Sequence, residues 1–466
     1  MRLNPEGLCV RHPPDRASGC GRAAVAATTL AVLTLGGSPV RAQSEPAAMV
    51  RDETRLQAEP AGVRLVGPFY RLAPPPASDA VSEPSPLSLT VRQGWRHHSN
   101  LYALSASVAQ AQPGLSGADT VSVTGLRAAF DRRLGAQELA LWADLGASAY
   151  RRFDDLDHVA WNAGGLLNWQ IGRQWYGTVS VGSERFLNPF SNQNRAIRNL
   201  LDLNALASSV GYRFGARWSA FAGADFVSRR NSSVDLRETD LDQTGLEAGF
   251  RLQGTNADSD VSLVARTVRG RFPNPQQFDA QGDPLAQPLD NGFRDRSALL
   301  RLSLRPSAPS RLVGEVGVTA RRFDTLTVRN FSGLTGSFVW QWQPTDPLRA
   351  ELYARRNLGP IQLGSPNYID AVQTGGSLSW RVTSRLTLGA TAGWDRYRYG
   401  GDPLSATGQT EERRDRVRTI GVSAAYEAWR RVTLIADHRR EWRTSNYSAF
   451  SFDADITSLF VRARFD

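Results

Sequence analysis

Side chains that could contact a polar solute recur at every second position in parts of this chain. Between residues 348 and 355 the odd positions hold Arg349, Glu351, Tyr353 and Arg355, while the even positions hold Leu and Ala. Successive residues of a strand point to opposite faces, so the four polar groups would share one face. Guanidinium, carboxylate and phenol groups together donate and accept hydrogen bonds. The spacing therefore predicts a strand with one apolar face and one face that contacts water or solute.

Histidine is the residue type most able to support catalysis here. Hydrolases use it with Ser, Asp or Asn, and residues 43–466 contain four: His97, His98, His158 and His438. His97 and His98 are adjacent, so on a strand they would point to opposite faces and could not chelate one metal ion together. His438 falls on an apolar face. We therefore expect no enzymatic activity, no metal and no cofactor, with a hydrolase as the distant alternative.

The first 42 residues have the pattern of a secretory signal peptide. An Arg-bearing start precedes the apolar run Ala23 to Leu35, and Val40-Arg41-Ala42 provides a small-residue cleavage site. We expect cleavage after Ala42. Both cysteines, Cys9 and Cys20, lie inside this leader, so the remaining chain would have neither a disulfide nor a thiolate metal site.

After Pro86 the chain is built from amphipathic segments of about ten to fifteen residues. The last one, Ile456 to Phe465, places Leu459, Val461, Ala463 and Phe465 on one face and ends in an aromatic residue. Only 41% of the residues are hydrophobic and the mean hydropathy is −0.35, which excludes a bundle of membrane helices. A membrane barrel remains, because only every second strand residue must face lipid. Residues 87–466 are therefore predicted to form an all-β, antiparallel up-and-down transmembrane barrel.

The connections between these segments alternate in length. Short links are predicted at 134–137, 172–174, 215–217, 306–310, 344–347, 384 and 430, and longer ones at 99–118, 188–197, 272–291, 400–413 and 445–452. Short periplasmic turns and long extracellular loops are typical of barrels in the bacterial outer membrane of Gram-negative cells. The count is about eighteen strands, with sixteen as the alternative. The final strand would close against Leu87 to His98.

Tryptophans and the N-terminal region complete the predicted layout. Seven of the 12 tryptophans, Trp169, Trp175, Trp218, Trp340, Trp342, Trp380 and Trp429, adjoin a short link and predict an aromatic girdle at the periplasmic interface. A soluble β-sandwich is the alternative explanation for them. Residues 43–86 are rich in Pro, Ala and Ser, and we expect a disordered periplasmic segment that either enters the lumen or lies free.

A barrel of this width should enclose a water channel unless a segment fills it. By parity, eleven cations face the lumen: Arg152, Arg251, Arg266, Arg301, Arg321, Arg349, Arg355, Arg381, Arg439, Arg462 and Arg464. Ten anions face them: Asp144, Glu184, Asp225, Glu247, Glu315, Glu351, Asp395, Glu427, Asp437 and Glu441. This near balance argues against a simple anion filter, and we expect many of these charges to pair across neighbouring strands.

A mixed polar lining would suit a hydrated polyhydroxyl solute, although an ordinary solvated lumen without a chosen solute explains the same residues. The candidate solute contacts are Arg349, Glu351, Tyr353, Arg355, Arg381, Arg266, Arg301, Tyr150 and Asp395, and Arg349, Arg355 and Arg381 are the candidates for a constriction. The formal charge is +10, and every basic residue is Arg, which we interpret as coding bias of a GC-rich genome. Basic and aromatic residues do not cluster together, so we expect no nucleic-acid partner.

Several stretches resemble the EpsL-like outer-membrane β-barrels of exopolysaccharide biosynthesis operons, which are grouped with the putative β-barrel porin 2 family. They are Asn100-Leu101-Tyr102 and the segments 126–132, 150–157, 167–175, 183–186 and 263–272. The resemblance extends from about Val91 to the C-terminus. It implies a role in passing an exopolysaccharide across the outer membrane with periplasmic polymer-export proteins, in contact with outer-membrane lipid. A general diffusion porin for small polar solutes is the alternative.

Overall fold

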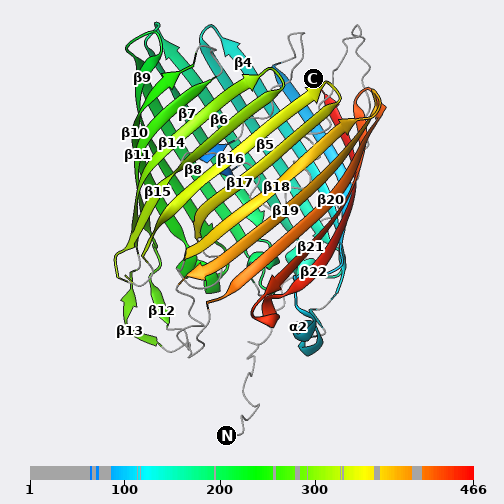
Figure 1. The fold of residues 1–466 in the computed structure, drawn as a ribbon. Helices are drawn as coiled ribbons and strands as arrows, with labels where there is room; N and C mark the ends of the chain where they lie inside the picture. Colours follow the sequence, from blue (N-terminus) through cyan, green and yellow to red (C-terminus); the bar gives the residue numbers. More distant parts are fainter. Residues whose placement is uncertain are drawn as a thin grey trace, which may run out of the picture. The chain divides into compact units, whose positions relative to one another are not determined.

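Eighteen strands form a closed antiparallel barrel, as the sequence predicts (Figure 1). The computed structural model describes residues 63–65, 70–72, 86–112, 114–115, 117–193, 196–254, 259–278, 284–290, 292–325, 327, 330–360, 368–400 and 412–465. The first barrel strands are β3 (Leu87–His98), β4 (Asp119–Leu134), β5 (Gln137–Tyr150), β6 (His158–Ile171), β7 (Trp175–Leu187), β8 (Leu200–Arg213), β9 (Trp218–Asn231), β10 (Leu241–Gln253) and β11 (Asp260–Arg271). The others are β14 (Phe293–Ser307), β15 (Ser310–Phe323), β16 (Phe331–Thr345), β17 (Leu348–Pro360), β18 (Tyr368–Arg381), β19 (Leu386–Gly400), β20 (Arg414–Trp429), β21 (Val432–Ser445) and β22 (Phe452–Phe465).

The last strand closes the barrel against the first. In β22 and β3 the register runs from Ile456 opposite His98 to Phe465 opposite Leu89, which confirms the predicted closure. This closure leaves no unpaired strand edge in the barrel, as a bilayer without hydrogen-bonding partners requires.

Alternate residues of each strand face the surroundings and the lumen. In β22, Leu459 is 57% exposed on the outer face, whereas its neighbour Phe460 is 3% exposed and points inward with Arg462. Leu145 of β5 and Leu352 of β17 are likewise exposed outward. The period-two pattern therefore places apolar side chains where lipid must be, and the predicted faces are confirmed.

Short turns and long connections lie at opposite ends of the barrel. All the predicted short links are confirmed, and one more joins β10 to β11, where the Gly254 amide donates to Ser259 O at 2.6 Å. Gly135 and Gly172 sit in two of these turns with φ near +60°, a conformation that favours glycine. The end of β22 lies among the short turns, at the top in Figure 1. By the usual asymmetry this end is periplasmic and the loop end extracellular.

The long connections carry short elements that strand periodicity does not predict. They are α2 (Ala106–Ala111), η1 (Asp154–Leu156), α3 (Phe190–Gln193), η2 (Val234–Thr239), the antiparallel pair β12 (Gln276–Phe278) and β13 (Pro284–Leu289), and η4 (Ser448–Phe450). None of the helices described is long and apolar enough to cross a membrane.

The predicted tryptophan girdle is present at the short-turn end. Trp175, Trp218, Trp342, Trp380 and Trp429 are all exposed there, where the amphipathic indole can bridge lipid and water. Of the N-terminal 86 residues, the structure describes only Pro86 and the short antiparallel pair β1 (Val63–Leu65) and β2 (Tyr70–Leu72). The predicted leader 1–42 and most of the segment 43–86 lie outside the described residues.

A charge placed on the outer face should destabilise the barrel. Leu459 lies near the middle of β22 and is exposed outward, so we expect Leu459→Arg to cost about 2–4 kcal/mol of unfolding free energy. Urea unfolding in lipid vesicles measures this cost. Thr391→Arg, on the lumen face of β19, is the control and should leave stability nearly unchanged. Equal costs at the two positions would contradict the assignment of faces.

Candidate functional site: a loop-lined cavity in the lumen

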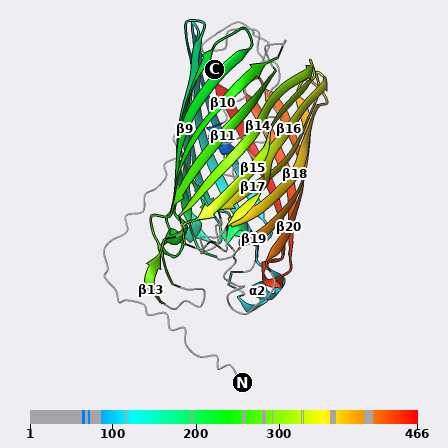
Figure 2. The ribbon, with the colours of Figure 1, turned by 60° about the vertical axis from the view of Figure 1, so that its left-hand side comes forward.

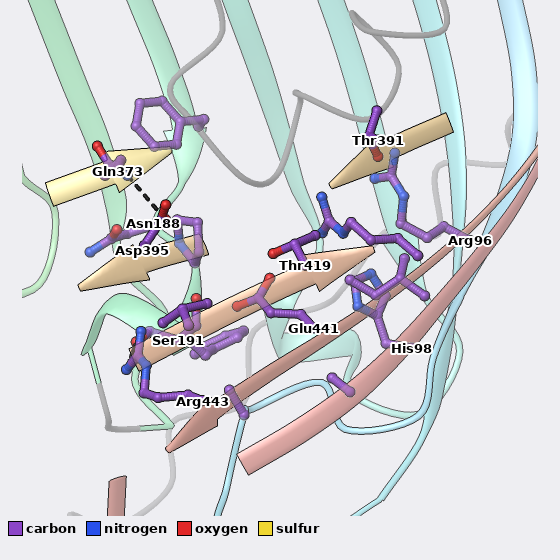
Figure 3. A pocket seen from close by; sticks show the side chains of 18 of the residues that line it. Arg96, His98, Asn188, Ser191, Gln373, Thr391, Asp395, Thr419, Glu441 and Arg443 are labelled. Atoms are coloured by element: carbon purple, nitrogen blue, oxygen red, sulfur yellow. Dashed lines mark hydrogen bonds between the residues drawn. The ribbon is translucent and has the colours of Figure 1, made fainter. Parts of the chain in front are cut away.

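A loop from one part of the barrel wall reaches a strand in another part, with five strands between them. Ser191 lies in α3, on the connection between β7 and β8, and its carbonyl oxygen accepts a hydrogen bond from Arg443 Nη1 of β21 at 2.6 Å. The two residues are 252 positions apart in the chain. Figure 3 shows Ser191 beside the end of the Arg443 side chain, with Asn188 nearby. The β7–β8 loop therefore narrows the lumen at the loop end.

Aromatic packing holds this loop inside the barrel. The Tyr102 ring, from the β3–β4 loop, packs edge-on against Phe190 with centroids 4.5 Å apart and against Phe153 at 4.9 Å. Burial, with smaller contributions from Asp155 and Asp119, raises the pKa of Tyr102 to about 12. Tyr102 therefore stays neutral in ordinary conditions and contributes packing rather than charge. The rings of Tyr102, Phe153 and Phe190 therefore pack three loops together, namely β3–β4, β5–β6 and β7–β8.

The wall around β19–β21 presents a buried charge network to the loop. Asp415 accepts two hydrogen bonds from Arg413, at 3.1 and 2.6 Å, and one from Tyr399 Oη at 3.0 Å. Arg443 Nε lies 3.8 Å from the same carboxylate. The bonds from Arg413 and Tyr399 fix the Asp415 carboxylate, and its negative charge attracts the Arg443 guanidinium, whose Nη1 donates to the loop carbonyl.

Between loop and wall lies a cavity of about 430 Å³. Its polar wall includes Gln373, whose Nε2 donates to Asp395 Oδ2 and to Tyr397 Oη, both at 3.1 Å, while Tyr397 Oη donates to Asp395 at 2.9 Å. On β16 and β17, Gln341 Nε2 donates to Glu351 Oε2 at 3.2 Å. The volume lies within the roughly 300–1,000 Å³ of typical ligand pockets. Such a lining offers both donors and acceptors to a solute.

The cavity is more cationic than the lumen as a whole was predicted to be. Its lining contains the five arginines Arg92, Arg96, Arg355, Arg439 and Arg443, and three carboxylates, Glu351, Asp395 and Glu441. The side chains also include aromatic surface from Phe190, Tyr353 and Phe452. An excess of positive charge at the narrow part of a pore favours anions over cations.

The structure brings together five of the nine predicted solute contacts. Tyr150, Glu351, Tyr353, Arg355 and Asp395 line the cavity. The proposed constriction set is divided, because Arg355 lines the cavity whereas Arg349 and Arg381 lie near the short-turn end, opposite Ser379 and Thr387. The remaining two, Arg266 and Arg301, lie in a different part of the wall.

Arg266 and Arg301 belong to a ladder of buried ion pairs. Arg266 binds Asp225 through two hydrogen bonds of 2.7 and 3.1 Å and lies 3.7 Å from Glu247. Arg301 bridges Glu247 at 3.2 Å and Glu315 at 3.1 Å. Pairing of lumen charges between strands is thus confirmed for these residues. Arg152, assigned by parity to the lumen face of a strand, instead lies in the β5–β6 loop, because β5 ends at Tyr150.

Sequence analysis missed Arg92, Arg96, His98 and Arg443 among the lining residues. The parity of β3 could have found three of them, since Trp95 is exposed outward and the even positions must then face inward. His98 Nε2 is buried without a hydrogen-bond partner in the described part of the chain. His97 is exposed, near Thr120, which confirms that the adjacent histidines face opposite sides. The described residues contain no group of three or more His, Cys, Asp or Glu side chains that could hold a metal ion.

Comparisons with known proteins give one family match over part of the chain and several solved structures of low identity. Residues 309–465 match the family model described as "Putative beta-barrel porin 2". No curated protein matches the chain significantly. Among solved structures, Pseudomonas aeruginosa OccK9 (OpdG) has 13% identity and a TM-score of 0.43, with 81% of this chain and 97% of that chain covered. P. aeruginosa OccK2 (OpdF) in complex with glucuronate has 11% identity and a TM-score of 0.44, with coverages of 81% and 97%. The siderophore receptor PirA of Acinetobacter baumannii has 8% identity and a TM-score of 0.40, with coverages of 83% and 81%.

These identities are too low to transfer a solute from any of those proteins. The family match and the closed barrel with an apolar outer face do support a cellular location for the protein. The chain is a β-barrel of the bacterial outer membrane, and its residues 309–465 match a porin family model.

Proposed function

We propose that this barrel is a selective channel for hydrated polyhydroxyl solutes with acidic groups, and that it takes part in exopolysaccharide export. The observation that carries the proposal is the cavity between the β7–β8 loop and the wall formed by β16–β22. Its amide, phenol and carboxylate groups suit the many weak hydrogen bonds of a sugar. Its five arginines against three carboxylates favour an acidic sugar over a cationic solute.

The direction of transport comes from the sequence resemblance alone. The stretches that resemble the EpsL-like barrels imply an exopolysaccharide as substrate and periplasmic polymer-export proteins as partners. One of these stretches, Asn100-Leu101-Tyr102, supplies two residues of the cavity lining, Asn100 and Leu101. The loop that carries the resemblance is therefore also part of the candidate site. The match to the putative β-barrel porin 2 family equally supports the alternative, a general diffusion porin.

Deletion of the gene should abolish the surface polymer and leave uptake of small solutes unchanged. The reason is that a narrow, loop-lined lumen would serve a dedicated substrate rather than the general traffic of the cell. Polymer is measured on whole cells, and uptake by the growth rate on limiting small sugars. In planar bilayers the purified protein should show low conductance that a uronic-acid oligosaccharide blocks more strongly than a neutral one of equal length.

The double variant Arg355→Gln, Arg439→Gln tests whether the cavity arginines select the solute. Both arginines line the cavity, so the variant should insert normally and lose the preference for the acidic oligosaccharide. If the purified protein conducts freely and the deletion strain keeps its polymer, export is wrong and the general porin stands. If polymer is lost but the two oligosaccharides block equally, export stands and the solute class is wrong.

A further inference from the structure

Three arginines on neighbouring strands occupy directly opposite positions on the outer face. Arg269 of β11 is opposite Arg294 of β14, and Arg294 is opposite Arg322 of β15. All three are exposed, with the same parity as the exposed Leu263 and Leu300. Directly opposite residues in antiparallel strands have Cβ atoms only about 5 Å apart, and like charges there are unfavourable. This row, which we call the arginine row, needs an anion.

Four other arginines of the outer face near the loop end have a carboxylate on the next strand. Such pairs join Arg185 to Asp202 at 2.5 Å, Arg230 to Asp242 at 2.8 Å, Arg356 to Asp370 at 2.8 Å and Arg440 to Asp453 at 3.1 Å. Within the described part of the chain, the ion pairs include none formed by the arginine row. The described residues therefore leave the arginine row available to an anion from outside the protein.

The depth of the arginine row matches the headgroup region of the outer leaflet. Arg294 is the second residue of β14, Arg322 the next to last of β15, and Arg269 two positions before the end of β11. At about 3.3 Å per residue, each lies within roughly 7 Å of the strand end. These strands face the viewer in Figure 2, with the loop end at the bottom. Phosphate groups of outer-leaflet lipids lie at this level.

An open groove of about 900 Å³ borders the row on the outer face. Arg294 and Arg296 lie at its loop end, and small or apolar residues of β10, β11, β14 and β15 form most of the rest: Leu246, Ala248, Ala265, Thr267, Ala298, Val318 and Ala320. Glu247, Arg266 and Ser297, whose side chains have lumen parity, complete the lining. The four alanines have short side chains, so they leave a shallow groove between the larger side chains around them. The groove is therefore apolar where lipid tails lie and cationic where headgroups lie.

We infer that the arginine row and this groove bind a phosphorylated glycolipid of the outer leaflet. Guanidinium groups bind phosphate through paired, charge-assisted hydrogen bonds. Arg269, Arg294 and Arg322 hold the phosphate, with Arg296 beside it, and one acyl chain lies over the alanines. The bound lipid neutralises a row of like charges that the fold otherwise leaves side by side. This site is on the outer face and is independent of the lumen cavity and its solute.

The test counts lipids bound to the full-length mature barrel by native mass spectrometry. The probes are bisphosphorylated lipid A and the same lipid without phosphates. Arg396 and Arg416 of β19 and β20 also face each other outward, so bound copies are counted rather than merely detected. We expect the variant Arg269→Gln, Arg294→Gln, Arg322→Gln to lose one bound copy and to bind at least about tenfold more weakly, because it lacks the charge-assisted bonds.

Two further variants separate the chemistry of the site from general charge. Arg185→Gln, Arg230→Gln, Arg356→Gln removes the same formal charge from paired arginines and should keep the copy that the arginine row binds. Ala298→Trp fills the groove, keeps all the arginines and should weaken binding of the same copy. The inference is overturned if the arginine-row variant binds as the wild type does, or if the dephosphorylated lipid binds equally well. It is also overturned if the wild type is a dimer through this face and the arginine-row variant is a monomer with unchanged lipid.

Discussion

Shortening the β7–β8 loop should raise the single-channel conductance at least about twofold, because the loop narrows the lumen and pore diameter controls conduction. Leu187 and Leu200 are paired at the ends of β7 and β8, and the Asn188 amide donates to Asn199 O at 2.8 Å. Residues 188–199 can therefore be replaced by Asn-Gly, which forms a two-residue hairpin turn. The strands remain complete, so the barrel should still insert. Planar-bilayer recordings measure the change.

Two variants define what the loop does. Arg443→Gln removes the donor to Ser191 O, together with the positive charge beside Asp415, and keeps the loop, so we expect a smaller rise in conductance with more frequent fluctuations. Replacing residues 324–330 of the β15–β16 connection with a short turn is the matched control, since none of the described residues there lines the cavity. An unchanged conductance after removal of 188–199, or an equal rise in the control, would show that the loop does not form the constriction.

The same contrast explains what the sequence could predict. Strand count, closure and the inward face depend on a period of two, which is local and can be read from residues such as Leu459 and Arg462. The contact of Ser191 with Arg443 joins residues 252 positions apart, and the connection that carries Ser191 has no period at all. Its inward course follows from aromatic packing of Phe190 on Tyr102. That packing depends on which loops meet, and periodicity contains no information on it.

The sequence predicts that charged residues of the lumen form ion pairs, but it does not predict which residues pair with each other. Cross-strand rules consider adjacent strands, yet Arg266 of β11 binds Asp225 of β9 across the intervening β10. The residue of β10 between them is Gly245, and a Cβ at that position would collide with both the Asp225 carboxylate and the Arg266 guanidinium. The missing side chain makes room for the pair. A glycine on a lumen face between two opposite charges is the signal that sequence analysis could have used.

Breaking the Arg266–Asp225 pair should lower the free energy of unfolding more than the other substitutions proposed for this barrel. The side chains of Arg266, Asp225 and Glu247 are 7%, 2% and 0% exposed. Removing one partner of a buried pair typically costs about 3–5 kcal/mol, because the other charge remains buried without compensation. Arg266→Met keeps most of the volume and leaves Asp225 without its bidentate partner, so we expect a loss of this size. Urea unfolding in lipid vesicles measures it.

A double substitution distinguishes lost attraction from an uncompensated charge. Replacing both members of a buried pair by apolar residues is often nearly neutral, so Arg266→Met with Asp225→Leu should recover most of the stability that Arg266→Met loses. The pair Arg133–Glu138, with side chains 75% and 50% exposed, provides the control, and Arg133→Met should cost at most about 1 kcal/mol. If Arg266→Met lowers the free energy of unfolding no more than Arg133→Met does, the ladder of ion pairs contributes little to the stability of the barrel. If the double substitution is less stable than Arg266→Met alone, the uncompensated charge of Asp225 is not the cause of the loss.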